Sequence, residues 1–124
     1  MSGDGFIFDS GRILFRQNGR EFSPNSIEGV VSVTAGSRGH GCRLGLINGN
    51  SISVQWGSSN YCSNRHASLD STNSFSPDAE IAIFSPSDEW HNFGSDTVDG
   101  WKSVAGVMNY IATYSKARIV RQAG

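Results

Sequence analysis

The segment 60–66, which reads NYCSNRH, holds the densest group of chemically versatile side chains in the sequence. It combines two amides, a phenol, a thiol, a guanidinium group and an imidazole, and it closely follows Trp56. An aromatic ring can stack on a planar ligand, while amides and a guanidinium group bind polar edges and anions. We therefore interpret this segment as the wall of a ligand pocket, with four candidate contacts: Asn60, Tyr61, Asn64 and Arg65.

The alternative is a polar loop in which the Asn and Ser side chains only satisfy hydrogen bonds of the loop's own backbone. The flanking Trp and Tyr favour the pocket, because both rings offer a large flat surface. A second candidate group lies in the sequence EWHNF at 89–93. As a strand, this segment puts Trp90 and Asn92 on one face and His91 and Phe93 on the other.

Cys62 raises the question of catalysis, since it could form a nucleophilic set with His66 or His91 and with Asp96. No familiar nucleophile motif surrounds Cys62, and two cysteines and three histidines offer such combinations by chance. The sequence also contains four possible zinc ligands: His40, Cys42, Cys62 and His66. The spacings between these residues do not match common structural zinc patterns, so we expect neither a metal nor another cofactor.

Composition narrows the class of protein and of ligand. The chain of 124 residues fits one domain with one core, and its net charge of −1 argues against binding of long nucleic acids. Eight of the ten basic residues are Arg, whose planar fork suits phosphates and carboxylates, so an anionic ligand fits the sequence. Surface arginines that are merely solvated are the alternative for any one of them.

The sequence also suggests where the protein works. No apolar run reaches the length of a membrane span, and the first residues lack the pattern of a secretory signal. Cys42 and Cys62 lie in different local settings, which favours free thiols over a disulfide. We expect a cytoplasmic protein without membrane contact.

Strand and turn signals recur along most of the chain. Asn18-Gly19 and Asn48-Gly49 each interrupt apolar runs and predict hairpins. We expect strands at the following ranges: 5–17, 29–34, 43–47, 51–56, 79–84 and 89–93. The last two form a third hairpin around Ser85 to Asp88, and the polar segment 57–76 is expected to lack regular structure.

A helix ends the predicted order of elements. Ser103 can cap it, and an apolar stripe at helical spacing follows: Val104, Val107, Met108 and Ile111. Gly106 inside this helix suggests close approach of another backbone. Asp96 and Asp99 suit the lead-in to the helix, and Phe93 and Trp101 are expected in the core.

These patterns predict an α+β fold: an antiparallel sheet of hairpins followed by a C-terminal amphipathic helix. We expect one ligand-binding domain over residues 1–124, with N-terminal hairpins in 1–50 and the central sheet, a hairpin and the helix in 51–124. The tail from Ala117 carries Arg118 and Arg121 around an apolar pair, which could pair as a short strand or contact another subunit.

Two runs also carry a resemblance to a known family. The first is SVQWG at 53–57 with NYCSNR at 60–65, and the second is AEIAIF at 79–84. The second run continues through Trp90, 92–94, 96–98 and 100–101. Together they resemble the Thoeris anti-defence sponges of bacteriophages, which sequester cyclic ADP-ribose signals. The resemblance covers roughly residues 51–115 and does not extend to the first 50 residues.

The resemblance implies a non-catalytic phage protein for immune evasion, which removes a host signal and assembles as a dimer or hexamer. Some members of the family also capture cyclic oligonucleotides. Its binding residues are aromatic, Asn and Arg side chains, and the positions that match by type and motif are Phe84, Trp90, Asn92, Arg65 and Arg118. The family has more helical structure than the single helix predicted here.

Our leading hypothesis is therefore a sponge for a cyclic nucleotide signal inside an infected bacterium. Two other classes remain open. One is a small hydrolase that depends on Cys62, and the other is a phage structural module or a module that binds a host protein.

Overall fold

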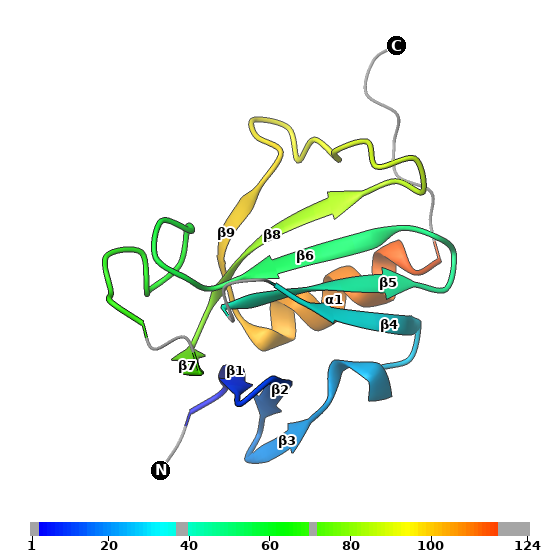
Figure 1. Ribbon diagram of the computed structural model, residues 1–124. Coiled ribbons are helices and arrows are strands. Elements are labelled where there is room, and N and C mark those ends of the chain that lie inside the picture. Colours follow the sequence, from blue (N-terminus) through cyan, green and yellow to red (C-terminus); the bar gives the residue numbers. More distant parts are fainter. Residues whose placement is uncertain (1–2, 37–39, 70–71, 117–124) are drawn as a thin grey trace.

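The computed structural model describes residues 3–36, 40–69 and 72–116, and within them two antiparallel sheets and one helix form an α+β fold (Figure 1). The smaller sheet has the order β3-β2-β1-β7, with these bounds: β1 Gly5–Asp9, β2 Arg12–Gln17, β3 Arg20–Phe22 and β7 Asn73–Ser76. The larger sheet has the order β4-β5-β6-β8-β9, with these bounds: β4 Val30–Ala35, β5 Gly41–Leu46, β6 Ser51–Gln55, β8 Ala79–Phe84 and β9 Asp99–Lys102. A short 3-10 helix, η1 (Pro24–Ser26), links the sheets, and α1 spans Val104–Tyr114.

Two tight turns shape the smaller sheet. Asn18 and Gly19 have φ values of 54° and 78°, so the predicted Asn-Gly hairpin is confirmed as a turn with two left-handed residues. Ser10 and Gly11, at 48° and 92°, form a second turn of the same kind between β1 and β2. The expected single strand 5–17 is therefore two strands, and the turn escapes prediction because Ser-Gly is a weaker turn signal than Asn-Gly.

The Asn48-Gly49 hairpin is confirmed, but its turn has three residues rather than two. The amide of Gly49 donates to the carbonyl of Leu46 at 2.9 Å, and Leu46 in turn donates to Asn50 at 2.8 Å. Gly49 alone is left-handed, at φ 94°. This is a type I turn closed by a left-handed residue, a common three-residue hairpin loop. The loop at 85–89 repeats it, with Asp88 in the left-handed position at φ 64°.

Three predictions for the second half of the chain were wrong. The segment 57–76 contains a strand, β7, which pairs with β1 and completes the smaller sheet. The expected strand 89–93 is reduced to one bridge between Phe84 and Trp90, because the chain then leaves the sheet. Residues 99–102 form β9 at the edge of the larger sheet instead of a lead-in to the helix.

The helix begins where the sequence predicts. The Ser103 side chain accepts a hydrogen bond from the Gly106 amide at 3.2 Å and caps the first turn. Val104, Val107 and Ile111 are buried against the larger sheet. A Cβ added at Gly106 would meet its nearest neighbour, Lys102, at 3.6 Å, so the expected close approach of another backbone is absent. Within the described residues, no helix is long and apolar enough to cross a membrane.

The larger sheet has two different faces. The helix α1 covers one of these faces (Figure 1). That face carries buried apolar side chains from the three central strands: Leu44, Leu46, Ile52, Val54, Ile81 and Ile83. Side chains alternate along a strand, so the neighbouring positions point to the opposite face. We call this the outer face, and its residues on the same three strands are Arg43, Gly45, Ser51, Ser53, Gln55, Glu80, Ala82 and Phe84.

Candidate ligand-binding face of the larger sheet

Glu80 fixes the polar loop 57–68 to the outer face. Its two carboxylate oxygens accept hydrogen bonds from the Asn60 side-chain amide and from the Tyr61 backbone amide, each at 3.1 Å. The Asn60 oxygen accepts from the Gly57 amide at 3.0 Å. Both ends of the Asn60 amide are therefore used within the protein, and Glu80 holds Asn60 and Tyr61 side by side.

Asn64 also holds the loop in place. Its side-chain nitrogen donates to the carbonyl of Trp56 at 3.0 Å and to that of Phe75 at 2.9 Å. Because Trp56 follows β6 and Phe75 belongs to β7, this one amide ties the loop to both sheets. Only the bond between Asn60 and the Gly57 amide lies within the loop's own backbone, as the alternative interpretation expects, whereas the other bonds of Asn60 and Asn64 join the loop to the sheets. Direct ligand contacts through the two residues stay a prediction.

Two side chains of this loop stack with one from β9, and we call the group the Tyr61 cluster: Tyr61, Arg65 and Trp101. The guanidinium carbon of Arg65 lies 4.4 Å from the centre of the Tyr61 ring. The Trp101 ring lies 5.7 Å from the same ring. Trp101 is 57% exposed, so an aromatic surface next to a cation faces solvent.

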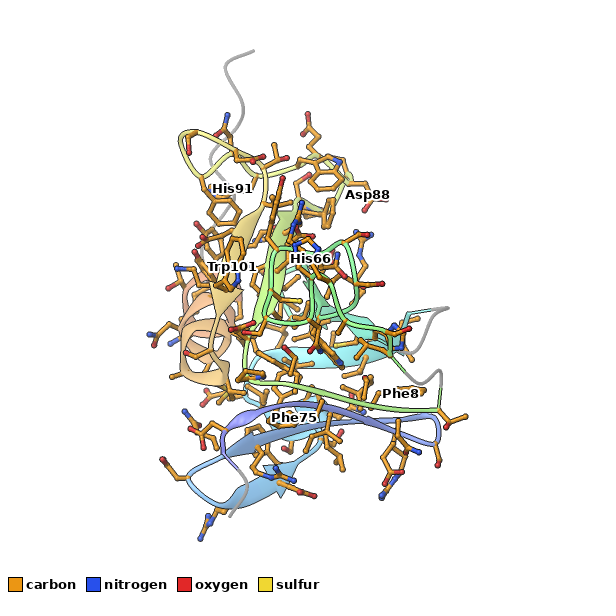
Figure 2. The ribbon with its side chains drawn as sticks, turned by 90° about the vertical axis from the view of Figure 1, so that its left-hand side faces the viewer. Phe8, His66, Phe75, Asp88, His91 and Trp101 are labelled. Atoms are coloured by element: carbon orange, nitrogen blue, oxygen red, sulfur yellow. The ribbon has the colours of Figure 1, made fainter. Side chains whose placement is uncertain are left out.

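The backbone explains why Trp101 points outward, and the expectation that it lies in the core is wrong. The pairing of β8 with β9 contains a bulge, and Trp101 adopts a left-handed φ of 52°. Its amide donates to the Tyr61 carbonyl at 2.8 Å. Gly100 permits this approach, because a Cβ there would lie 2.7 Å from the Tyr61 Cβ. Bulges commonly redirect a side chain, and here the bulge presents an indole to solvent (Figure 2).

A second group of side chains lies at the other end of β8, and we call it the Phe84 cluster: Arg43, Phe84 and Trp90. The Phe84 ring is 4.5 Å from the Trp90 ring and 4.4 Å from the guanidinium carbon of Arg43. Trp90 is 48% exposed, whereas Phe84 is buried beneath it. Arg43 also donates to the Ser51 hydroxyl at 3.0 Å and pairs with Asp88, so its guanidinium group is held in place.

Phe84 and Trp90 are predicted site residues, whereas Arg43 is not. Arg43 occupies the outward position between Cys42 and Leu44, both of which are buried in β5. An arginine at an outward strand position is an ordinary feature of soluble sheets, so the sequence offers no local signal that sets Arg43 apart. What sets Arg43 apart is its place in the sheet, where it pairs with Ser53, which in turn pairs with Ala82. This register is known only from the folded structure.

The remaining predicted site residues are less closely associated with either cluster. Asn92 is exposed, and its side-chain oxygen accepts from the Gly94 amide at 2.7 Å. Arg118 lies outside the described residues. His91 points toward the helix, on the opposite side from Asp88 (Figure 2), and shares a hydrogen bond of 3.0 Å with the Tyr114 hydroxyl.

The two clusters lie at opposite ends of one row of side chains. Glu80, Ala82 and Phe84 share the outer face of β8, so the anchor of the Tyr61 cluster lies about 13 Å from the Phe84 cluster. Small side chains lie between them, since Ala82 pairs with Ser53. A polar cavity of about 450 Å³ adjoins the start of the 57–68 loop and is lined by residues such as His40, Gln55 and Ser58.

The cysteines do not have the surroundings of nucleophiles. The Cys62 thiol is 1% exposed and donates to the Gly57 carbonyl at 3.5 Å. Burial raises its pKa, which keeps it protonated, and burial also raises the pKa of Cys42 to about 12. Both thiols are free, as the sequence predicts. Across the described ranges, no three His, Cys, Asp or Glu side chains are grouped so that they could hold a metal ion.

Comparison with known proteins identifies no relative. No family model matches the chain, and neither the curated proteins nor the solved structures contain a match.

Proposed function

We propose that the protein binds a cyclic nucleotide signal on the outer face of the larger sheet and sequesters it without chemical change. In this proposal it acts as a phage sponge in the cytoplasm of an infected bacterium, where it blocks a host defence. The observation that carries the proposal is the presence of two arginine–aromatic clusters at the two ends of β8 on one face.

The chemistry of the clusters suits such a ligand. A cyclic ADP-ribose isomer has a base that can stack and a pyrophosphate that attracts cations. The exposed rings of Trp90 and Trp101 offer stacking surfaces, and Arg43 and Arg65 each lie 4.4 Å from a ring centre. Base stacking on an aromatic side chain contributes about 1–3 kcal/mol, and a guanidinium group adds charge-assisted hydrogen bonds to phosphate.

Retention without turnover is consistent with the same geometry. Cys62 is buried and its pKa is raised, which makes the thiol a poor nucleophile and supports binding over hydrolysis in this proposal. The ligand-facing groups are rings, guanidinium groups and hydroxyls, which bind a phosphate ester but do not attack it. Assembly into dimers or hexamers, which the family resemblance implies, belongs to the proposal as well.

The test is to incubate the purified protein with cyclic ADP-ribose isomers, remove free ligand, and heat the protein to release what it retained. Mass spectrometry of the released material should find the ligand unaltered, and native mass spectrometry of the complex gives the number of ligands and subunits. Release of a hydrolysed product would mean an enzyme. No retention of any isomer, or of cyclic oligonucleotides, would overturn the proposal.

A matched control is present on the smaller sheet. Arg16 lies 5.8 Å from the centre of the Phe75 ring, and Phe75 is 41% exposed. This pair resembles the two clusters in composition but belongs to the other sheet. Trp90→Ala and Trp101→Ala should each weaken retention by about tenfold or more, whereas Phe75→Ala should not change it. Equal effects of all three would show that retention is non-specific.

A further inference from the structure

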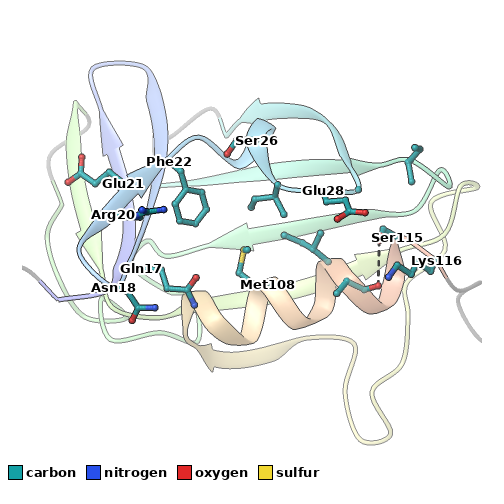
Figure 3. A pocket seen from close by; sticks show the side chains of 15 residues that line it. Gln17, Asn18, Arg20, Glu21, Phe22, Ser26, Glu28, Met108, Ser115 and Lys116 are labelled. Atoms are coloured by element: carbon teal, nitrogen blue, oxygen red, sulfur yellow. Dashed lines mark hydrogen bonds between the residues drawn. The ribbon is translucent and has the colours of Figure 1, made fainter.

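A groove separate from the proposed ligand face runs between α1 and the layer formed by β2, β3 and η1 (Figure 3). Its volume is about 1120 Å³, and apolar side chains from both walls line it: Phe22, Ile27, Met108 and Ile111. Ile111 is almost fully buried, while Phe22 and Met108 are half-buried. A groove with such a lining favours an apolar occupant.

The chain leaves its helix at one end of this groove. Ser115 and Lys116 both line it, and Ser115 packs so closely against Gly29 that a Cβ there would lie 2.8 Å from the Ser115 side chain. The Ser115 hydroxyl donates to the Ala112 carbonyl at 3.5 Å (Figure 3). Whatever follows Lys116 therefore starts beside the groove.

The sequence that follows has the right length and composition. Residues 117–124, which lie outside the described residues, read ARIVRQAG, with Ile119 and Val120 between two arginines. Eight residues reach roughly 26 Å when extended, whereas the helix from Met108 to Tyr114 is roughly 9 Å long. The segment can therefore reverse direction and still cover the apolar part of the groove.

The rim of the groove offers charges that complement this segment. Glu28 is exposed near the Lys116 end, and it forms no ion pair within the described part of the chain (Figure 3). Glu21 lies near the other end and pairs with Arg16. Arg20 and Lys116 also lie on the rim, so the rim is not uniformly negative. Glu21 and Glu28 are separate positions at which an arginine could form an ion pair.

We propose that residues 117–124 bind in this groove of their own chain. Ile119 and Val120 cover Met108 and Ile111, and an arginine of the segment meets Glu28. The segment then completes the apolar core at the seam between the helix and the smaller sheet.

Two double-cysteine variants test this placement. Ala112 and Thr113 are both exposed on α1, but only Ala112 lines the groove. Ala112→Cys with Val120→Cys should form an intramolecular disulfide about tenfold faster than Thr113→Cys with Val120→Cys, because a disulfide needs Cα atoms about 4.4–6.8 Å apart. The native thiols are buried, so they should not compete. The rates are read from intact mass after mild oxidation.

Further outcomes separate the possible occupants. Adding Ile119→Asp to the Ala112 pair should reduce its rate to that of the Thr113 pair. Equal rates in the two original variants would overturn the proposal. A disulfide that joins two chains, seen as a covalent dimer, would show that a second copy supplies the segment and would equally overturn it. None of these measurements depends on a nucleotide, so they stand apart from the test of the proposed function.

Discussion

The backbone amide of Trp101 donates to the carbonyl oxygen of Tyr61 at 2.8 Å, and the rings of the same two residues lie 5.7 Å apart. An edge strand and a loop distant from it in sequence are thus joined twice, once through the backbone and once through the side chains. The contact requires a left-handed Trp101, an uncommon conformation for a bulky residue. Such strain often occurs at functional sites.

This strain predicts that binding and stability respond differently to substitution of Trp101. Glycine adopts the left-handed conformation without steric cost, so Trp101→Gly should be at least as stable to urea as Trp101→Ala. Both variants lose the exposed indole and should retain about tenfold less ligand. Urea unfolding and ligand titration on the same preparations measure the two effects. A Trp101→Gly variant clearly less stable than Trp101→Ala would contradict the strain argument.

Arg43 should depend on the shape of its side chain as well as on its charge. Lysine keeps the charge but cannot lie flat on Phe84 or bind a phosphate through a planar fork, so Arg43→Lys should weaken ligand binding by about tenfold. Arg12→Lys is the control, because Arg12 belongs to a surface pair with Asp9. Calorimetric titration compares the two, and unchanged affinity in Arg43→Lys would place the ligand elsewhere.

The two thiols should be inert in the folded protein. Burial raises the pKa of both Cys42 and Cys62, so little thiolate is present at neutral pH and reagents cannot reach it. We expect no labelling by iodoacetamide under native conditions and full labelling of both in urea, measured by intact mass. Rapid native labelling of Cys62 would restore the case for a catalytic thiol.

His91 should make the stability dependent on pH. Burial lowers its pKa below the ordinary value of 6.5, and its Nδ1 atom has no hydrogen-bond partner among the described residues. The unfolded chain therefore takes up a proton on His91 at a higher pH than the folded chain, and stability should fall as the pH drops below 6.5.

His91→Phe preserves the aromatic contacts with Phe93 and Tyr114 but cannot titrate. The difference in melting temperature between wild type and this variant should thus change between about pH 8 and pH 5, in the direction that penalises the wild type in acid. If the difference in melting temperature between the two proteins stays constant over this pH range, His91 is not the source of the pH dependence.

Gly106 should be replaceable with a gain in stability. A Cβ there meets only ordinary van der Waals neighbours, and alanine favours a helix over glycine, so Gly106→Ala should add about 0.5–1 kcal/mol to the free energy of unfolding. Gly29→Ala is the opposite case, because Gly29 is left-handed at φ 94° and its Cβ would collide with Ser115. Urea unfolding of both variants should give changes of opposite sign.

Local signals predicted the local parts of this fold. Asn18-Gly19 and the Ser103 cap act within a few residues, and both formed the structures expected of them. The strands β7 and β9 were missed because their evidence is not local. Asn73–Ser76 is short and polar, and it becomes a strand only because β1 provides a partner far away in the sequence.

The candidate site likewise contains residues that can be predicted from the sequence and residues that depend on the fold. Tyr61, Arg65, Phe84 and Trp90 could be identified from residue type, and each belongs to one of the two clusters. Trp101 could not, because an aromatic residue before an amphipathic helix normally enters the core, and only the bulge in β9 turns it outward. The hydrogen-bond partners of Asn60 and Asn64 could not be predicted either, because they depend on the folded conformation of the loop.

The short connection between β7 and β8 has a consequence for the order of folding. Pro77 and Asp78 alone separate the last strand of the smaller sheet from a central strand of the larger one, and the Asp78 carboxylate also holds Ser63. The N-terminal hairpins can form early, because their contacts are local. Neither sheet is complete until β7 and β8 have paired, and these two strands are adjacent in the sequence. We therefore expect the two sheets to form in one cooperative step, with the 57–68 loop taking its shape in the same event.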